Sequence, residues 1–338
     1  MTEAAVARPE GQATQQPRRL KTNRGLSDQV FRGVARGGGA LVLVIMALVG
    51  AFLTYRAVSA LRKAGSSFLT TQEWNPDAGE FGIAAVILGT ILIAVVAIVV
   101  ATVLAVGVAL FISEFAPLWI RSFLVGLVDL MAAVPSVVFG LWGAFFLQWR
   151  VVSLSRWISD WFGWIPFFSV SGVTRHDPLA TPTVYTSSTF IAGLVVALMV
   201  APIACSVMRE AFSQAPAGER EGAYALGATR WGMISTVVLP FGKGAIIGGT
   251  MLGLGRALGE TIAVVMIISP VFVIQPRIFE NGTSSVSSLI ATHYGESSPF
   301  ALSALFAAGL ALFAMTLVVN FVAASIVARS RSGAVSEV

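Results

Sequence analysis

Long apolar runs separated by short charged segments dominate the hydrophobic pattern of this chain. Runs of about 18 or more residues with few charges are candidate membrane-spanning helices. Six runs of this kind lie at about residues 38–55, 84–112, 122–147, 188–208, 244–269 and 300–328. The pattern therefore predicts an all-α membrane protein with about six transmembrane helices.

The composition agrees with a membrane environment. Hydrophobic residues make up 56% of the 338 residues and charged residues only 12%, whereas about a quarter of a soluble domain is charged. A single Cys and two His exclude a disulfide framework and disfavour a zinc site, so no metal site is predicted. If both termini are cytoplasmic, Lys and Arg lie on the inner side twice as often as on the outer side, the bias expected of a multi-pass protein.

These patterns divide the chain into four regions. Residues 1–36 are predicted to form a cytoplasmic, largely disordered tail, because their first part is polar. Residues 37–80 form the first transmembrane helix and an outer loop, 81–328 the main transmembrane domain, and 329–338 a cytoplasmic tail. The outer segment at 148–187 carries tryptophans that are typical of an interfacial helix, with docking of an external partner as the alternative reading: Trp149, Trp157, Trp161 and Trp164.

The connector between the fourth and fifth runs, residues 209–243, is predicted to hold a short helix on the cytoplasmic side. Glu219 and Glu221 place negative charge near its start, where the helix dipole favours it. Gly227 then ends or bends the helix, and Leu239-Pro240 marks the turn of the chain back towards the membrane. The connector is either a coupling element or an ordinary amphipathic link.

The fifth run combines glycines with two charges. Glycines four residues apart, as at 249 and 253, allow close helix packing in lipid. Arg256 and Glu260 are expected on one helix face at i, i+4 spacing. Charges at this depth normally face a cavity or each other. They are either a neutralised structural pair or an anion path, because the planar donors of Arg suit an oxyanion.

Two hydroxyl groups complete the candidate substrate path. Thr261 follows Glu260 directly, and Ser136 follows Pro135 in the third run, where a kink is expected and Ser136 is predicted to recapture freed backbone groups. The stretch GLGRALGET is not a phosphate-binding P-loop, because it lacks the required spacing and Lys. No cofactor is therefore predicted on this chain.

Three segments resemble the PstC family of permeases from ABC phosphate importers, which are binding-protein-dependent type I importers. They are AAVPSVVFGLWG at 132–143, EGAYALGATRW with LP at 221–240, and GLGRALGET at 253–261. The second segment is similar to the loop E-A-A-x3-G-x9-I-x-L-P by which such permeases dock on their ATPase. Gly222 and Val237 are its departures from that pattern.

The resemblance implies a type I permease core in a bacterial plasma (inner) membrane. It implies a PstA-like second permease, a dimeric PstB-like ATPase that holds ATP and Mg, and an external PstS-like phosphate-binding protein, so this chain is not expected to be an enzyme. The family's embedded Arg and Glu map to Arg256 and Glu260. The residues expected to couple the ATPase to transport are Glu219, Glu221, Gly222, Ala223, Gly227, Leu239 and Pro240.

Three other functions compete with that of a phosphate permease. A permease for another oxyanion, such as molybdate or sulfate, would share the fold, and the segment PSVVFGLWG favours phosphate. A secondary transporter would work without an ATPase. An intramembrane protease is disfavoured, because the chain lacks G-x-G-D, G-x-S-G and H-E-x-x-H.

Overall fold

The computed structural model describes residues 26–172 and 181–330. The chain divides into two units, Met1–Val49 and Gly50–Val338. Helix α1 (Leu26–Ala64) runs through the boundary between them. Residues 26–36, which the sequence pattern placed in the tail, are therefore helical, while residues 1–25 and 331–338 lie outside the described part.

The second unit is helical apart from one short hairpin. After α1 come η1 (Gly65–Leu69), β1 (Trp74–Asn75), β2 (Glu80–Phe81), α2 (Ala84–Leu110), η2 (Phe111–Phe115), α3 (Leu118–Ala133), α4 (Ser136–Trp142), η3 (Gly143–Leu147) and α5 (Gln148–Phe162). The second half has η4 (Pro166–Phe168), η5 (Pro182–Tyr185), α6 (Thr189–Ser213), α7 (Ala217–Ala225), α8 (Arg230–Met233), η6 (Ile234–Val238), α9 (Leu239–Leu258), α10 (Ile262–Ile267), α11 (Val286–His293), η7 (Tyr294–Glu296) and α12 (Pro299–Ser330). Strands β1 and β2 pair antiparallel, and η2, η3 and η6 are π-helical turns.

Helices α2, α6 and α9 form the centre of this unit, with α3 against α6 and α12 against α9. Small residues allow this close packing. Buried alanines recur every four residues along α2, at Ala97, Ala101, Ala105 and Ala109. A Cβ on Gly193 of α6 would come within 2.6 Å of Val96 Cγ1. The close packing predicted for the glycines at 249 and 253 is confirmed, because a Cβ on Gly253 would overlap Val200 Cγ1 and one on Gly249 would lie 3.1 Å from Ala204 O.

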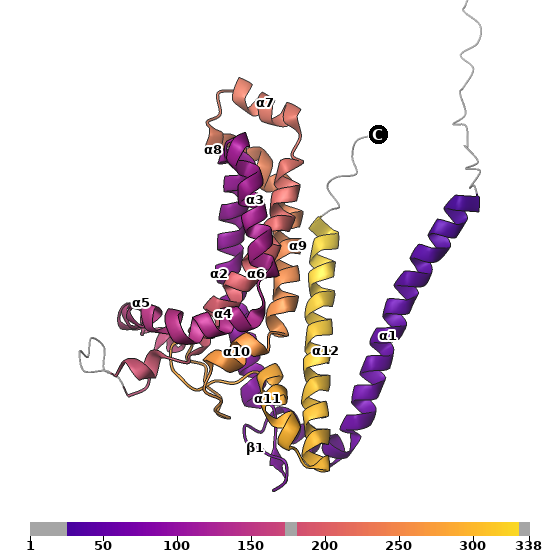
Figure 1. The fold of residues 1–338 in the computed structure, drawn as a ribbon, viewed down its shortest axis with the longest axis vertical. Coiled ribbons are helices and arrows are strands. Elements are labelled where there is room, and N and C mark those ends of the chain that lie inside the picture. Colours follow the sequence, from indigo (N-terminus) through magenta and orange to yellow (C-terminus); the bar gives the residue numbers. More distant parts are fainter. Residues whose placement is uncertain (1–25, 173–180, 331–338) are drawn as a thin grey trace, which may run out of the picture. The chain divides into compact units, whose positions relative to one another are not determined.

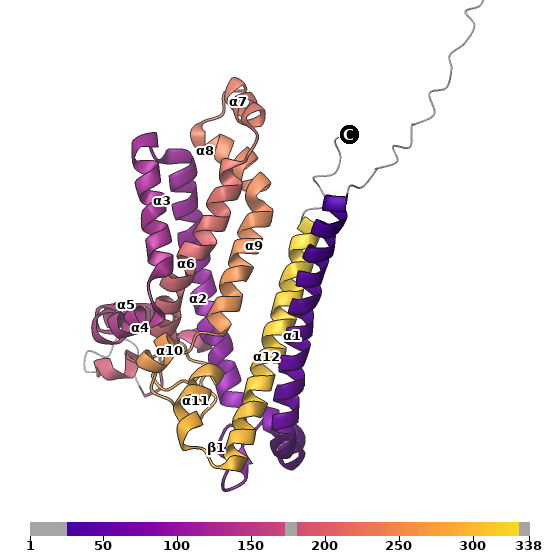
Figure 2. The ribbon, with the colours of Figure 1, turned by 45° about the vertical axis from the view of Figure 1, so that its right-hand side comes forward.

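The helices alternate in direction between two ends of the bundle, here called the α7 end and the α11 end after the helices found there (Figures 1 and 2). Helix α2 runs to the α7 end and α3 runs back. Helix α6 returns to the α7 end, α9 runs to the α11 end, and α12 runs back again. Six helical stretches among the described residues are long and apolar enough to span a membrane; the third of them is Ser136–Phe162 rather than α3.

The third apolar run is divided, although the sequence predicted one span over 122–147. Helix α3 ends at Ala133, and Val134 and Pro135 are extended. Pro135 has no N–H and disfavours helical backbone at Val134. Helices α4 and α5 then lie across the bundle rather than along it (Figures 1 and 2). The 16-residue α3 is therefore the part of this run that lies along the bundle, and α5 lies where the interfacial helix was predicted.

The fifth run also differs from its prediction. Residues 230–258 form one continuous helical stretch through α8, η6 and α9. The predicted turn at Leu239-Pro240 is wrong. The π-turn η6 lets Leu239 N donate to Ile234 O, and the helix passes Pro240 without turning. The stretch ends at Leu258, with Gly259 as its C-cap, so the helix predicted over 244–269 is interrupted before α10.

Candidate substrate path and coupling site

The exposed helix α7 projects from the α7 end of the bundle (Figure 1). None of its side chains is fully buried. Its C-terminus is closed by hydrogen bonds from Gly227 N to Tyr224 O (2.9 Å) and from Ala228 N to Ala223 O (3.0 Å). This is the Schellman pattern, and Gly227 has the φ of +84° that it requires. Gly227 therefore ends the helix.

The predicted coupling residues divide into two groups. Glu219, Glu221 and Gly222 are exposed on α7, and a Cβ on Gly222 would meet nothing within 4 Å. Leu239 and Pro240 lie apart from them, at the start of α9. The first group, with Gly227, is exposed, whereas Ala223 is half-buried and packs against the core at the end of α6. Tyr224 and Leu226 extend the exposed surface, and Leu226 is 91% exposed.

The attachment of this loop to the bundle depends on Arg220, which the sequence reasoning did not single out. Its Nη1 donates to Glu114 Oε2 at 2.8 Å. Its Nε donates to Ala215 O at 3.2 Å and its Nη2 to Phe212 O at 2.5 Å. Glu114 belongs to η2, and its side chain is only 4% exposed. The one sequence signal for Glu114 is an isolated acid at the end of a long apolar run.

Two further arginines contact η2. Arg121 of α3 donates from Nη2 to Ser113 O at 2.7 Å. The guanidinium of Arg230, in α8, lies 4.8 Å from the ring centre of Phe115, a cation–π distance. Side chains from α3, α7 and α8 therefore converge on one five-residue turn at the end of α2.

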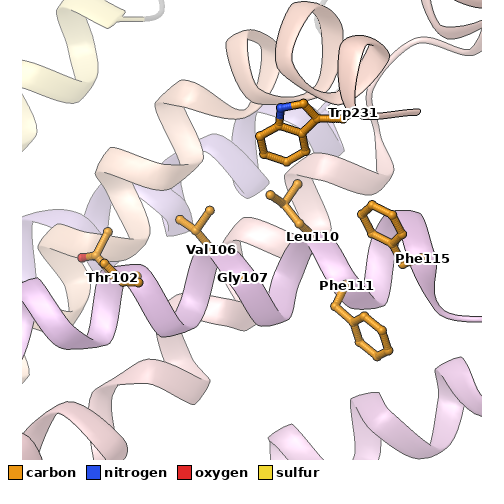
Figure 3. Close-up of a pocket in the computed structure, with 8 residues that line it drawn as sticks. Thr102, Val106, Gly107, Leu110, Phe111, Phe115 and Trp231 are labelled. Atoms are coloured by element: carbon orange, nitrogen blue, oxygen red, sulfur yellow. The ribbon is translucent and has the colours of Figure 1, made fainter. Parts of the chain in front are cut away.

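An apolar groove of about 620 Å³ runs along α2 next to this turn. Figure 3 shows Trp231 lying over Leu110 and Phe115, while Phe111 points away from it. The one hydroxyl in the groove belongs to Thr102, whose Oγ1 lies 3.2 Å from Thr250 Oγ1. The groove offers apolar packing and little polar recognition.

The predicted Arg256–Glu260 pair does not form. Arg256 lies in the last turn of α9, whereas Glu260 lies in the break beyond Gly259, so the two are not on one helix face. Glu260 Oε1 instead accepts from Ala263 N at 3.3 Å, which places the carboxylate at the N-terminus of α10. The contact of the Glu260 carboxylate is therefore this backbone N–H rather than Arg256.

Arg256 is exposed. Within the described residues its guanidinium has neither a hydrogen bond nor an ion pair. A charge at the centre of a bilayer costs about 2.5–3.5 kcal/mol, and a long side chain near a helix end can instead reach the interface. A water-filled space, a partner chain or the interface would each accommodate the charge of Arg256, which lies in the last turn of α9.

Thr261, another predicted path residue, lies in the same break. Thr261 Oγ1 donates to Gly259 O at 3.1 Å. Ser287 of α11 donates from Oγ to Glu260 O at 2.7 Å and so holds the break in place. Ser136 begins α4, which packs against α10, where a Cβ on Gly140 would lie 2.9 Å from Ala263 Cα. The Ser136 hydroxyl has no hydrogen bond among the described residues, so its predicted role in recapturing backbone groups is wrong.

The chain matches a known family over most of its length. Residues 102–332 match the family described as "Binding-protein-dependent transport system inner membrane component". Two solved structures share the fold at low sequence identity. One is the MetNI methionine ABC transporter in an inward-facing conformation, with a TM-score of 0.50 and 13% identity over 73% of this chain and 95% of that chain. The other is a bacterial ABC transporter involved in alginate import, with a TM-score of 0.52 and 15% identity over 91% of this chain and 100% of that chain.

Relatives of known name match a narrower family than the solved structures do. "Phosphate transport system permease protein PstC" of Pasteurella multocida is 34% identical over 300 residues, 88% of this chain and 91% of that protein. PstC of Xylella fastidiosa (strain Temecula1) is 36% identical over 287 residues, 84% of this chain and 86% of that protein. PstC 2 of Mycobacterium tuberculosis is 34% identical over 305 residues, 88% of this chain and 91% of that protein.

Fold and sequence together define the class as the multi-pass inner-membrane permease of an ABC importer. Within that class, the chain belongs to the PstC family of phosphate transport system permeases.

Proposed function

We propose that this chain is a permease subunit of an ATP-driven importer of inorganic phosphate and that Arg256 lines the path of the anion. The unpaired guanidinium at the end of α9 is the observation that carries the proposal. A planar donor group with no partner inside its own chain suits a phosphate-like oxyanion. Relatives that carry the name phosphate transport system permease supply the substrate class.

In this proposal Glu260 does not form a salt bridge with Arg256. Its carboxylate caps α10, so the positive charge of Arg256 remains available to the anion. The negative charge beyond Arg256 keeps the anion from binding too tightly to leave. Thr261 and Ser136 offer hydroxyls along the same path.

The remaining partners follow from the same family. A PstA-like second permease completes the path beside Arg256, and a PstS-like protein delivers phosphate at the α11 end. The exposed surface of α7 docks on a dimeric PstB-like ATPase, which holds ATP and Mg, so this chain itself catalyses no reaction. Basic residues gathered at the α7 end support a cytoplasmic orientation for that end and for both termini: Arg121, Arg209, Arg220, Arg230 and Lys243.

Reconstitution of the complete transporter in vesicles tests this proposal. Radiolabelled phosphate should accumulate only with ATP, with the ATPase subunit present and with the binding protein on the outside. Sulfate and molybdate should compete weakly. Accumulation without the ATPase would instead identify a secondary transporter, and strong competition by sulfate or molybdate would identify a permease for another oxyanion.

A further inference from the structure

The ion pair between Glu114 and Arg220 joins the exposed loop to the central helix of the bundle. The two residues are 106 positions apart in the chain, and the packing of α2 against α6 brings them together. The Glu114 side chain is 4% exposed and that of Arg220 is 21% exposed. Because both charges are largely removed from water, separating them would leave a buried carboxylate without a partner.

Arg220 also ties α7 to the end of α6. Its Nε and Nη2 donate to Ala215 O and Phe212 O, carbonyls at and just beyond the C-terminus of α6. The same side chain therefore holds α2, α6 and α7 at one point. Glu219, Glu221 and Tyr224 on α7 make no such contact within the described residues, so Arg220 provides the side-chain hydrogen bonds that anchor this helix.

Glu114 lies in η2, the π-turn that continues α2 beyond Leu110. Residues Phe111–Phe115 form a π-turn, closed by a bond from Ala116 N to Phe111 O of 2.8 Å. Turns of this kind inside helices often occur at functional sites. Arg121 and Arg230 contact the same turn. Glu114 Oε1 is buried without a hydrogen-bond partner, so Arg220 supplies the only direct neutralisation of this carboxylate in the described residues.

We infer that Glu114 and Arg220 are positioning residues that transmit displacement of α7 to α2 through η2. When a motor displaces α7, the buried ion pair keeps the loop and η2 moving as one body, because separating the two charges would leave the Glu114 carboxylate buried without a partner. The inference rests on the proposed function, since it assumes that α7 receives movement from an ATPase. It does not depend on the identity of the transported anion.

The substitutions Glu114→Gln and Arg220→Gln test this inference in the complete transporter. Glu114→Gln keeps the shape of the side chain and removes its charge, whereas Arg220→Gln removes the charge with a shorter side chain that also gives up the hydrogen bonds to Ala215 O and Phe212 O. We expect each variant to assemble with its partners at the wild-type level and to hydrolyse ATP within about twofold of the wild-type rate. Phosphate moved per ATP hydrolysed should fall at least about tenfold. The double variant should be no worse than the poorer single variant, because residues that act as one unit give non-additive effects.

The ion pair of Arg277 and Glu280 provides a matched control. It joins Nη1 and Oε2 at 3.2 Å but lies far along the chain from α7, in the segment that precedes α11. Arg277→Gln should leave the ratio of phosphate to ATP unchanged. Failure of the wild-type complex to transport phosphate would refute the proposed function itself.

With an active wild-type complex, three results would overturn the inference. The first is an unchanged phosphate-to-ATP ratio in both Gln variants. The second is loss of complex assembly in parallel with loss of uptake, which indicates a merely structural role. The third is an effect in the double variant equal to the product of the two single effects.

Discussion

Gly89 in α2 is the position at which the structure predicts the sharpest loss of stability from one added methyl group. A Cβ at Gly89 would overlap the backbone oxygen of Ser284 and lie 2.8 Å from Thr283 Oγ1. Backbone atoms cannot rotate away as a flexible side chain can. The segment leading into α11 would have to retreat, which would also strain the bond from Val286 N to Thr90 Oγ1, 3.0 Å long.

The magnitude follows from three contributions. Overpacking a well-filled site costs about 1–3 kcal/mol, and the upper end applies because the obstacle is backbone. Loss of one hydrogen bond adds about 1 kcal/mol. Replacement of Gly by Ala within a helix stabilises the helix by about 1 kcal/mol, which offsets part of these two costs. Gly89→Ala should therefore lower stability by about 2–3 kcal/mol, a shift of roughly 30- to 150-fold in the folding equilibrium.

Gly107 on the same helix is the matched control. A Cβ there would meet nothing within 4 Å, so Gly107→Ala should stabilise the chain by up to about 1 kcal/mol. The single cysteine of the chain, Cys205, reports unfolding because it is buried at 2% exposure. Thermal unfolding in detergent, followed by the fluorescence of a maleimide dye on that thiol, orders the variants. An unfolding midpoint for Gly89→Ala equal to or above that of Gly107→Ala would refute the packing argument.

Two further predictions concern function. Arg256→Gln should lower phosphate uptake by the assembled transporter at least about tenfold, because it removes the charge expected to stabilise the anion. It should leave the thiol-dye midpoint unchanged, because the guanidinium has no partner within the described chain; uptake within twofold of the wild type would contradict this. Glu221→Lys combined with Gly227→Val should abolish ATP-driven uptake. The first change reverses a charge on the exposed surface of α7. The second forces a branched residue into a φ of +84°, which costs about 1–2 kcal/mol. Normal uptake in that double variant would exclude α7 from coupling.

Most of the fold follows from the hydrophobic pattern. Apolar length alone predicts six membrane-spanning helices, and the structure has six that meet the same criterion among its described residues. The sequence predicts a kink at Pro135, but it does not predict that the chain after Pro135 lies across the bundle. The tryptophan-bearing segment after it is apolar enough to count as a span, yet it lies across the bundle. Helix direction depends on the extended backbone of two residues, Val134 and Pro135.

The site was less predictable than the fold. The i, i+4 spacing of Arg256 and Glu260 predicts a pair only if the helix continues, and Gly259 ends it. The helix α7 and its terminating Gly227 follow from local sequence signals. The contact of Arg220 with Glu114 requires α2 to lie beside α6, a tertiary arrangement that no local pattern encodes. The sequence predicts a break in the helix at Pro240, because the π-turn that accommodates this proline has no simple sequence signature.

The unbroken helix from Arg230 to Leu258 has a geometric consequence. At 1.5 Å per residue, its 29 residues form a rod about 43 Å long, with Trp231 near one tip and Arg256 near the other. A tilt of only about 5° around the first tip would carry the second through about 4 Å, roughly the size of a phosphate ion. If Arg256 lines the anion path as proposed, a small rotation at the exposed loop is enough to move the guanidinium into or out of reach of the anion.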